Sequence, residues 1–333
     1  MSRWRDRGLR CACRPIGWCF FVCVAALVSA CQPAARTVIP LEEAFTRNWL
    51  VSVEMSEQQF LWGLDTGAPF SLVDPEMLEL VPDTHAVEMK PAPPGFALSG
   101  FTGDEQPANV ELIVLQDYRL ATARITRHQN VALVDLGHFR ERGLEIYGIL
   151  GLDALRDRPF MLDPCALELT IFDSAPRRLP AGAELPIHNS HAGRGYITLQ
   201  LTVDGKVEEF ILDTGANYSS MAPAAVARVF GERSPDASEI RAVGTVVATR
   251  EDVRVAIFQA AEVQLAGVTL SRRDFRMDAG RDHNLLGMDL IAEFRWYFDL
   301  DRGRAIVKPA LEGRCPVARR ASPPWEGCQT NGC

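Results

Sequence analysis

Two aspartates in identical short motifs are the residues of this sequence best suited to act together chemically. Asp65 opens the segment Asp-Thr-Gly-Ala, and Asp213 opens the same segment 148 residues later. Amide hydrolysis without a metal or a covalent nucleophile needs a base to activate water and an acid to protonate the substrate. Two carboxyl groups about 3 Å apart cannot both ionise, so they share one proton and supply both functions. The sequence therefore predicts a catalytic pair, Asp65 and Asp213, that uses no metal and no cofactor.

The residues that follow each aspartate suit a tight turn. Gly67 and Gly215 allow backbone N–H groups to approach a carboxylate without a clash from a Cβ atom. Thr66 and Thr214 carry hydroxyl groups that can hydrogen-bond across an interface. A single Asp-Thr-Gly turn is a weak signal, whereas two copies with matching flanks are a strong one.

The two motifs belong to a longer internal repeat. Residues 64–71 and 212–219 are identical at six of eight positions. Gly151 ends the run Gly-Ile-Leu-Gly and Gly287 ends the run Asn-Leu-Leu-Gly, each followed by an apolar residue and Asp. Each half therefore predicts a strand, the aspartate turn, a variable middle, an apolar-apolar-Gly turn, a short helix and a final strand. The offset between the halves falls from 148 to 136, which places twelve extra residues in the first middle.

Short β-rich runs separated by turn residues dominate both halves. Strands are expected at 110–115, 130–134, 253–257 and 261–265, and brief helices at 76–80 and 224–230, each after a proline. We predict an all-β fold of two homologous β-barrel-like lobes with a few short helices and an active-site cleft between the lobes. The expected boundaries are a first lobe at 45–175, a linker at 176–186, a second lobe at 187–310 and a Cys-containing tail at 311–333.

Over about residues 45–310 the chain resembles pepsin-like and retropepsin-like aspartic peptidases in a single-chain, duplicated form, close to the bacterial branch of that clan. The resemblance rests on the paired Asp-Thr-Gly-Ala turns and the paired apolar-apolar-Gly turns. It implies the acid-protease fold and an aspartic endopeptidase acting on peptide or protein substrates. It also implies that Thr66 and Thr214 lock the two aspartate loops together, and that the segments at Gly151 and Gly287 support them.

The duplication makes a catalytic dimer unnecessary, so we expect a monomer. Two alternative functions stay open. One is a peptide-binding protein of the same fold that has lost turnover, although both aspartates are intact. The other is a processing protease with a single target.

Pepsins often carry Ser or Thr after the motif glycine, where this chain has Ala68 and Ala216, as is common in retropepsins. A hydroxyl group there favours the ionised aspartate, so its absence predicts a less acidic pair and activity toward neutral pH. A substrate-binding flap is expected at 96–103, with Gly100, Phe101 and Gly103 at a hairpin tip. An ordinary surface hairpin is the alternative interpretation of that segment.

The N-terminal residues predict export. Five arginines precede the apolar run 16–30, which has the length of a signal-peptide core and is short for a membrane span. The run ends in Val-Ser-Ala-Cys, which resembles the lipobox of bacterial lipoproteins and implies lipidation of Cys31. We expect a signal peptide at 1–30, a tether at 31–44 and a lipid anchor at the periplasmic face, in the outer membrane more than the inner. An ordinary signal peptide and an uncleaved anchor are the alternatives.

Charge and cysteine content set further limits. The net charge of −8 argues against nucleic acid as a partner, because phosphate binding needs a basic face. Export would place the later cysteines in an oxidising compartment, where disulfides form. Three pairings are open for these four residues: Cys165, Cys315, Cys328 and Cys333.

Overall fold

A computed structural model describes residues 35–44, 48–81, 86–91, 111–141, 143–188, 195–231, 240–244 and 252–310. Several predictions fall outside these ranges: the signal peptide, the lipidation site Cys31, the flap residues Gly100, Phe101 and Gly103, and the cysteines of the tail. Among the described residues, no helix has both the length and the apolar composition needed to cross a membrane.

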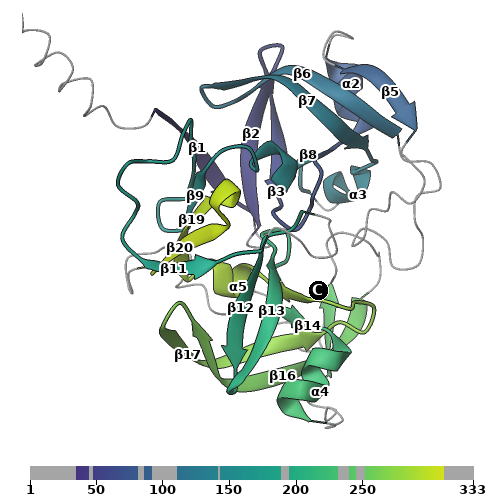
Figure 1. Cartoon of the computed structure of the whole chain (residues 1–333). Helices are drawn as coiled ribbons and strands as arrows, with labels where there is room; N and C mark the ends of the chain where they lie inside the picture. Colours follow the sequence, from purple (N-terminus) through teal and green to yellow (C-terminus); the bar gives the residue numbers. More distant parts are fainter. Residues whose placement is uncertain are drawn as a thin grey trace, which may run out of the picture. The chain divides into compact units, whose positions relative to one another are not determined.

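Six strands of the first half close into a barrel (Figure 1). The strands follow one another around the ring in the order β2 (Trp49–Met55), β3 (Gln58–Leu64), β8 (Ile146–Leu150), β4 (Leu72–Val73), β7 (Ala123–Leu133) and β6 (Glu111–Leu120). The ring closes because β2 pairs with β3 on one side and with β6 on the other. Strand β5 (Ala86–Pro91) extends the edge next to β6.

The second half forms a barrel with the same strand order. The closing pair is β12 with β16, and the ring runs through β12 (Thr198–Val203), β13 (Lys206–Leu212), β18 (Asn284–Leu286), β14 (Ser220–Met221), β17 (Val268–Met277) and β16 (Asp252–Leu265). Strand β15 (Ile240–Gly244) pairs with β16. The prediction of two barrel-like lobes is confirmed.

A six-stranded sheet joins the two halves. Its order is β11 (Ala183–Pro186), β20 (Arg304–Pro309), β19 (Phe294–Asp299), β9 (Phe160–Asp163), β10 (Glu168–Phe172) and β1 (Arg36–Glu43). At its centre β9 and β19 run antiparallel, so that Phe160 faces Phe298 and Leu162 faces Trp296. Residues 31–44, where we expected a tether, thus contain strand β1, and the expected linker 176–186 contains β11.

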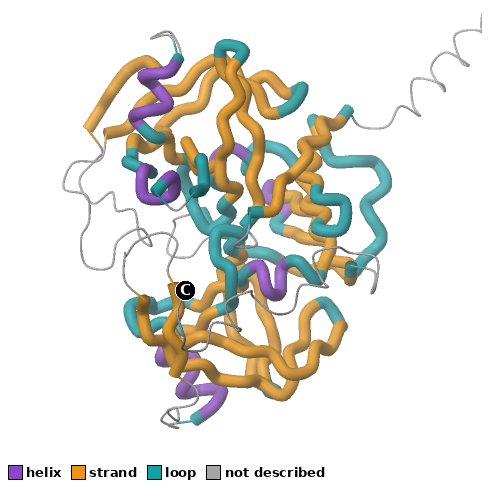
Figure 2. Tube along the Cα trace, turned by 180° about the vertical axis from the view of Figure 1, so that it is seen from behind, coloured by secondary structure: helices purple, strands orange, loops and turns teal. Residues whose placement is uncertain are grey.

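The helices are few and short, as Figure 2 shows. They comprise α2 (Pro75–Leu80), α3 (Gly137–Arg140), α4 (Pro223–Phe230) and α5 (Met288–Ile291), with 3-10 turns η2 (Leu152–Ala154) and η4 (Leu300–Arg302). Proline opens α2 and α4, where its fixed φ suits the first helical turn. The Asp74 side chain caps α2 by accepting from the backbone N–H of Glu76 at 2.8 Å.

One strand prediction needs correction. The segments 253–257 and 261–265 are parts of a single strand, β16, which pairs with β17 in one continuous register. The buried positions Phe258 and Ala260 are even-numbered, whereas the next buried positions, Val263 and Leu265, are odd-numbered, so the alternation changes phase between them. The facing Arg272 has a positive φ of 52°. A strand that bends without ending accounts for the two separate runs in the sequence.

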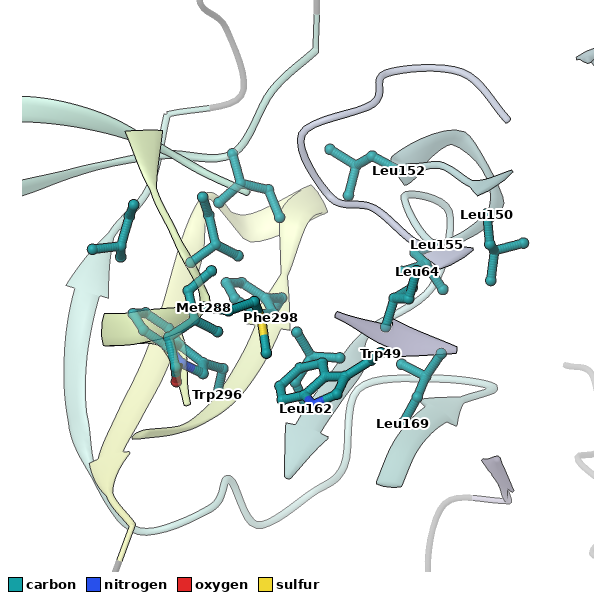
Figure 3. Packing of buried hydrophobic residues seen from close by; sticks show 14 of the residues in the cluster. Trp49, Leu64, Leu150, Leu152, Leu155, Leu162, Leu169, Met288, Trp296 and Phe298 are labelled. Atoms are coloured by element: carbon teal, nitrogen blue, oxygen red, sulfur yellow. Dashed lines mark hydrogen bonds between the residues drawn. The ribbon is translucent and has the colours of Figure 1, made fainter. Parts of the chain in front are cut away.

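One hydrophobic core extends from the first barrel through the joining sheet into the second barrel. It includes Trp49 and Leu64 of the first half, Leu162 of the joining sheet, and Met288 of the second half. Figure 3 shows these side chains packed in the same region. Because the halves share a core, the aspartate loops at their junction are held by packing from both sides.

Candidate active site

Each predicted aspartate follows a buried strand and is fixed by the neighbouring strand. Asp65 comes directly after β3, and its backbone N–H donates to the carbonyl oxygen of Leu150 at 3.0 Å. Asp213 comes directly after β13, and its N–H donates to Leu286 at 2.9 Å. The supporting strands β8 and β18 run parallel to β3 and β13. The apolar-apolar-Gly segments therefore lie beside the aspartates.

The structure brings the two aspartates into contact. Their carboxyl groups lie within hydrogen-bonding reach of each other, and both residues are half-buried. A Cβ atom added at Gly67 would lie 2.6 Å from Oδ1 of Asp213, and one at Gly215 would lie 2.6 Å from Oδ2 of Asp65. Each motif glycine thus makes room for the aspartate of the opposite lobe, in addition to relaxing its own turn.

Backbone donors hold the inner oxygen of each carboxyl group. Oδ1 of Asp65 accepts from the N–H groups of Gly67 at 2.8 Å and Ala68 at 3.1 Å. Oδ1 of Asp213 accepts from Gly215 at 2.8 Å and Ala216 at 3.0 Å. These bonds fix the carboxyl planes and stabilise negative charge on either group.

The two threonines bind the loops to each other reciprocally. The hydroxyl oxygen of Thr214 accepts from the N–H of Thr66 at 3.0 Å and donates to the carbonyl of Leu64 at 2.8 Å. The hydroxyl oxygen of Thr66 accepts from the N–H of Thr214 at 3.1 Å and donates to Leu212 at 2.9 Å. Both side chains are fully buried. We call these four bonds the threonine lock.

Burial controls the charge state of the pair. It raises the pKa of Asp65 well above its usual range, and the neighbouring Asp213 raises it further. Burial also raises the pKa of Asp213, while Arg281, the bond to Asp65 and the backbone donors lower it. Two interacting carboxyl groups titrate as a unit. The site is therefore built to hold one proton and one negative charge between two oxygen pairs.

The supporting glycines are required by backbone contacts. A Cβ atom on Gly151 would lie 2.6 Å from the carbonyl oxygen of Phe70, and one on Gly287 would lie 2.6 Å from that of Tyr218. These distances are far below van der Waals contact, so the second segment of each half packs directly on the aspartate loop.

A serine–aspartate pair in each lobe was missed as part of the site. The hydroxyl of Ser71 accepts from the N–H of Gly151 at 2.9 Å and donates to Asp153 at 2.7 Å. Ser219 does the same between Gly287, at 3.0 Å, and Asp289, at 2.8 Å. The serine and the aspartate occupy matching positions in both repeats, and this identity is the sequence signal that could have identified the pair.

The first lobe adds a buried histidine to this network. Nε2 of His128 lies 2.8 Å from Oδ2 of Asp153, and Nδ1 lies 2.8 Å from the hydroxyl of Tyr118. Both His128 and Tyr118 are buried. The chain of contacts thus runs from Tyr118 through His128 and Asp153 to Ser71, which lies six residues after Asp65.

The remaining predictions concern a metal site and the cysteines. No group of three or more His, Cys, Asp or Glu side chains in the described part of the chain could hold a metal ion. Cys165 is disulfide-bonded. The other three cysteines of that prediction lie outside the described residues, so the connectivity stays a prediction.

A family model matches the second barrel. Residues 199–293, which include Asp213 and Gly287, match the family model of the gag-polyprotein putative aspartyl protease. The matched segment covers most of the second barrel, from β12 to just beyond α5. No curated protein matches the chain significantly.

Among solved structures, a retropepsin-like aspartic protease from Rickettsia conorii is similar to this chain. It has 16% sequence identity and a TM-score of 0.30, over 38% of this chain and 89% of its own. The second barrel, which carries the family match, has the same strand order as the first barrel.

Proposed function

We propose that the protein is an aspartic endopeptidase that hydrolyses peptide bonds with water activated between Asp65 and Asp213. The observation that carries the proposal is the half-buried pair of adjoining carboxyl groups, held by matching backbone donors and by the threonine lock. Such a pair is suited to acid–base catalysis because it retains one proton at a pH where isolated carboxyl groups are ionised.

The chemistry follows from a singly ionised pair. The carboxylate takes a proton from water as the water oxygen attacks the peptide carbonyl carbon, and the protonated partner gives its proton to the carbonyl oxygen. As the C–N bond breaks, the pair gives its proton to the leaving amine nitrogen and takes one from a hydroxyl group of the tetrahedral intermediate, which becomes the new carboxyl group. The pair ends with one proton, as it began, so the cycle uses only water and peptide. We propose that the substrate lies in a cleft between the lobes.

We also propose that the protein is exported and anchored by lipid at Cys31. The arginine-rich start, the apolar run and the Val-Ser-Ala-Cys ending support this part of the proposal. Its test is metabolic labelling with a radioactive fatty acid, comparing the wild-type chain with Cys31→Ser. Label on the wild type alone would support the anchor, and an unlabelled wild type would contradict it.

Activity is tested by incubating the purified protein with a diverse peptide library from pH 3 to pH 8 and identifying products by mass spectrometry. Asp65→Asn and Asp213→Asn are matched controls, because each keeps the side-chain shape and removes the ionisable group. We expect cleavage by the wild type and none by either variant. Cleavage that survives in either variant would contradict the assignment. A wild type that binds peptides without cutting them would favour an inactive peptide-binding protein.

A further inference from the structure

Asn48 reaches from the first half of the chain to the aspartate loop of the second half. It lies immediately before β2, and its side-chain amide nitrogen donates to the carbonyl oxygens of Thr214 at 3.1 Å and Gly215 at 2.9 Å. The amide thus uses both hydrogens on two consecutive peptide groups of the loop that carries Asp213.

These two peptide groups are the ones that hold Asp213. The peptide that begins at the carbonyl of Thr214 carries the N–H of Gly215, which donates to Asp213 Oδ1. The next peptide begins at the carbonyl of Gly215 and carries the N–H of Ala216, which donates to the same oxygen. A hydrogen bond accepted by a peptide carbonyl polarises the group and strengthens the bond donated by its N–H. Asn48 therefore strengthens both backbone bonds to Asp213 at once.

The sequence repeat does not place a second asparagine beside the loop of Asp65. In the sequence repeat, Tyr196 occupies the position that matches Asn48. The charged groups around the two aspartates differ too. Arg281 lowers the pKa of Asp213 and so favours its ionised form, whereas burial and the charge of Asp213 both raise the pKa of Asp65.

We propose that Asn48 is a positioning residue that makes the aspartate pair asymmetric, placing the negative charge on Asp213 and the proton on Asp65. The inference rests on the proposed function and sharpens it. Asp213 is then the base that takes the proton of water, and Asp65 is the acid that protonates the peptide carbonyl. The first lobe thus determines the role of the second lobe's aspartate.

The test is the pH dependence of kcat/KM for the full chain and for Asn48→Leu, which has similar size and no donors. The acid limb reports formation of the singly ionised pair, and the alkaline limb reports loss of its last proton. We expect the acid limb of Asn48→Leu to move up by roughly half a pH unit, since polarisation strengthens each bond by about 10–30%. The alkaline limb should keep its position, because it reports the loss of the proton from Asp65, and Asp213 is ionised both before and after that step.

Control variants separate this role from a structural one. Asn48→Gln keeps the donor amide and should restore the acid limb, and Tyr196→Phe at the matching position should leave both limbs unchanged. If Asn48 had only a structural role, its loss would loosen the loop and lower kcat at every pH without moving either limb. Two results overturn the proposal. An upward shift of the alkaline limb alone would place the charge on Asp65, and a profile with both limbs unchanged would show that Asn48 does not set the charge.

A readout without turnover keeps this test separate from that of the proposed function. Carbon-13 NMR of labelled aspartate carboxyl groups follows the titration of the pair in the wild type and in Asn48→Leu. If the wild type cleaves no peptide, the proposed function fails, and the NMR titration still decides whether Asn48 favours charge on Asp213. Should Asn48→Leu fail to fold, Asn48→Ala provides the same comparison.

Discussion

The first and second lobes hold their aspartates with the same bonds but differ in what lies behind those bonds. Each carboxyl group accepts two backbone N–H bonds, and each loop gives one threonine to the lock. Behind the first loop, His128 bridges Asp153 and Tyr118. In the second loop, two backbone carbonyl oxygens accept hydrogen bonds from Asn48 of the opposite half, and the charge of Arg281 lowers the pKa of Asp213.

The difference separates two requirements of the chemistry. Bringing two carboxyl groups into contact needs symmetry, because each loop must leave room for the other, and the repeated glycines and threonines supply it. Assigning one carboxyl as acid and the other as base needs asymmetry. That asymmetry comes from residues outside the repeated motifs, which are the positions where the two halves diverged.

The largest expected effect on stability concerns the threonine lock. Thr66→Val and Thr214→Val each remove a hydroxyl and leave a buried N–H and a buried carbonyl without their partners. At about 1–3 kcal/mol for each of the two unsatisfied groups, we expect the free energy of unfolding to fall by roughly 2–6 kcal/mol in either variant. Urea unfolding measures both. A large loss in one variant and almost none in the other would contradict a symmetric lock.

A smaller loss is expected for the contact that only the first lobe has. His128→Leu leaves the Asp153 carboxylate and the Tyr118 hydroxyl without their shared partner, which should cost about 2–3 kcal/mol. Tyr118→Phe is the matched control, because it removes one hydroxyl and should cost about 1 kcal/mol. The same urea titration compares them. A His128→Leu variant no less stable than Tyr118→Phe would show that Asp153 does not depend on His128.

The two aspartates should also differ in how they affect stability with pH. Because the pKa of Asp65 is raised by folding, the folded chain keeps this proton after the unfolded chain loses it near pH 4, so stability falls as pH rises toward the raised pKa. Asp65→Asn cannot ionise and should therefore raise Tm at pH 7 more than at pH 4. Asp213→Asn should raise it less, because Arg281 and the backbone donors already support that charge. Calorimetry at both pH values tests this, and a pH-independent gain would contradict it.

The smallest effect is expected from restoring a hydroxyl beside each aspartate. Ala216→Ser adds a donor that favours the ionised form of the adjacent Asp213, which should move the acid limb of the rate profile down by up to about one pH unit. Ala68→Ser adds the same donor beside Asp65, which holds the last proton, and should therefore move the alkaline limb down and leave the acid limb in place. A wild-type profile that already peaks sharply below about pH 4 would contradict a pair made less acidic by the two alanines.

The repeat made much of this structure predictable. Identical motifs at a fixed offset predicted two barrel-like lobes, and the structure confirms the fold. The same repeat pointed to Asp65 and Asp213, which the structure brings into contact with Thr66, Gly67, Thr214 and Gly215 around them. Matching motifs impose matching backbone, so residues shared by both halves could be found without coordinates.

Features outside the repeat could not be found in this way. Asn48 differs from its counterpart Tyr196, and its contact spans 166 residues of sequence to Thr214. The partners of His128 depend on how β6 and β7 pair across a register shift. Strand β16 was divided in two because a local change of phase looks like a strand end when only the alternation is visible.

The most direct test of one site shared by both lobes is a comparison of Asp65→Asn, Asp213→Asn and the double variant, with kcat/KM measured on a single peptide substrate. If the two carboxyl groups act as a unit, each single variant should lose about 10²–10⁴-fold or more, and the double variant should lose no more than the worse single variant. A single variant with nearly full activity, or a double variant whose loss is the product of the two single losses, would contradict the shared pair.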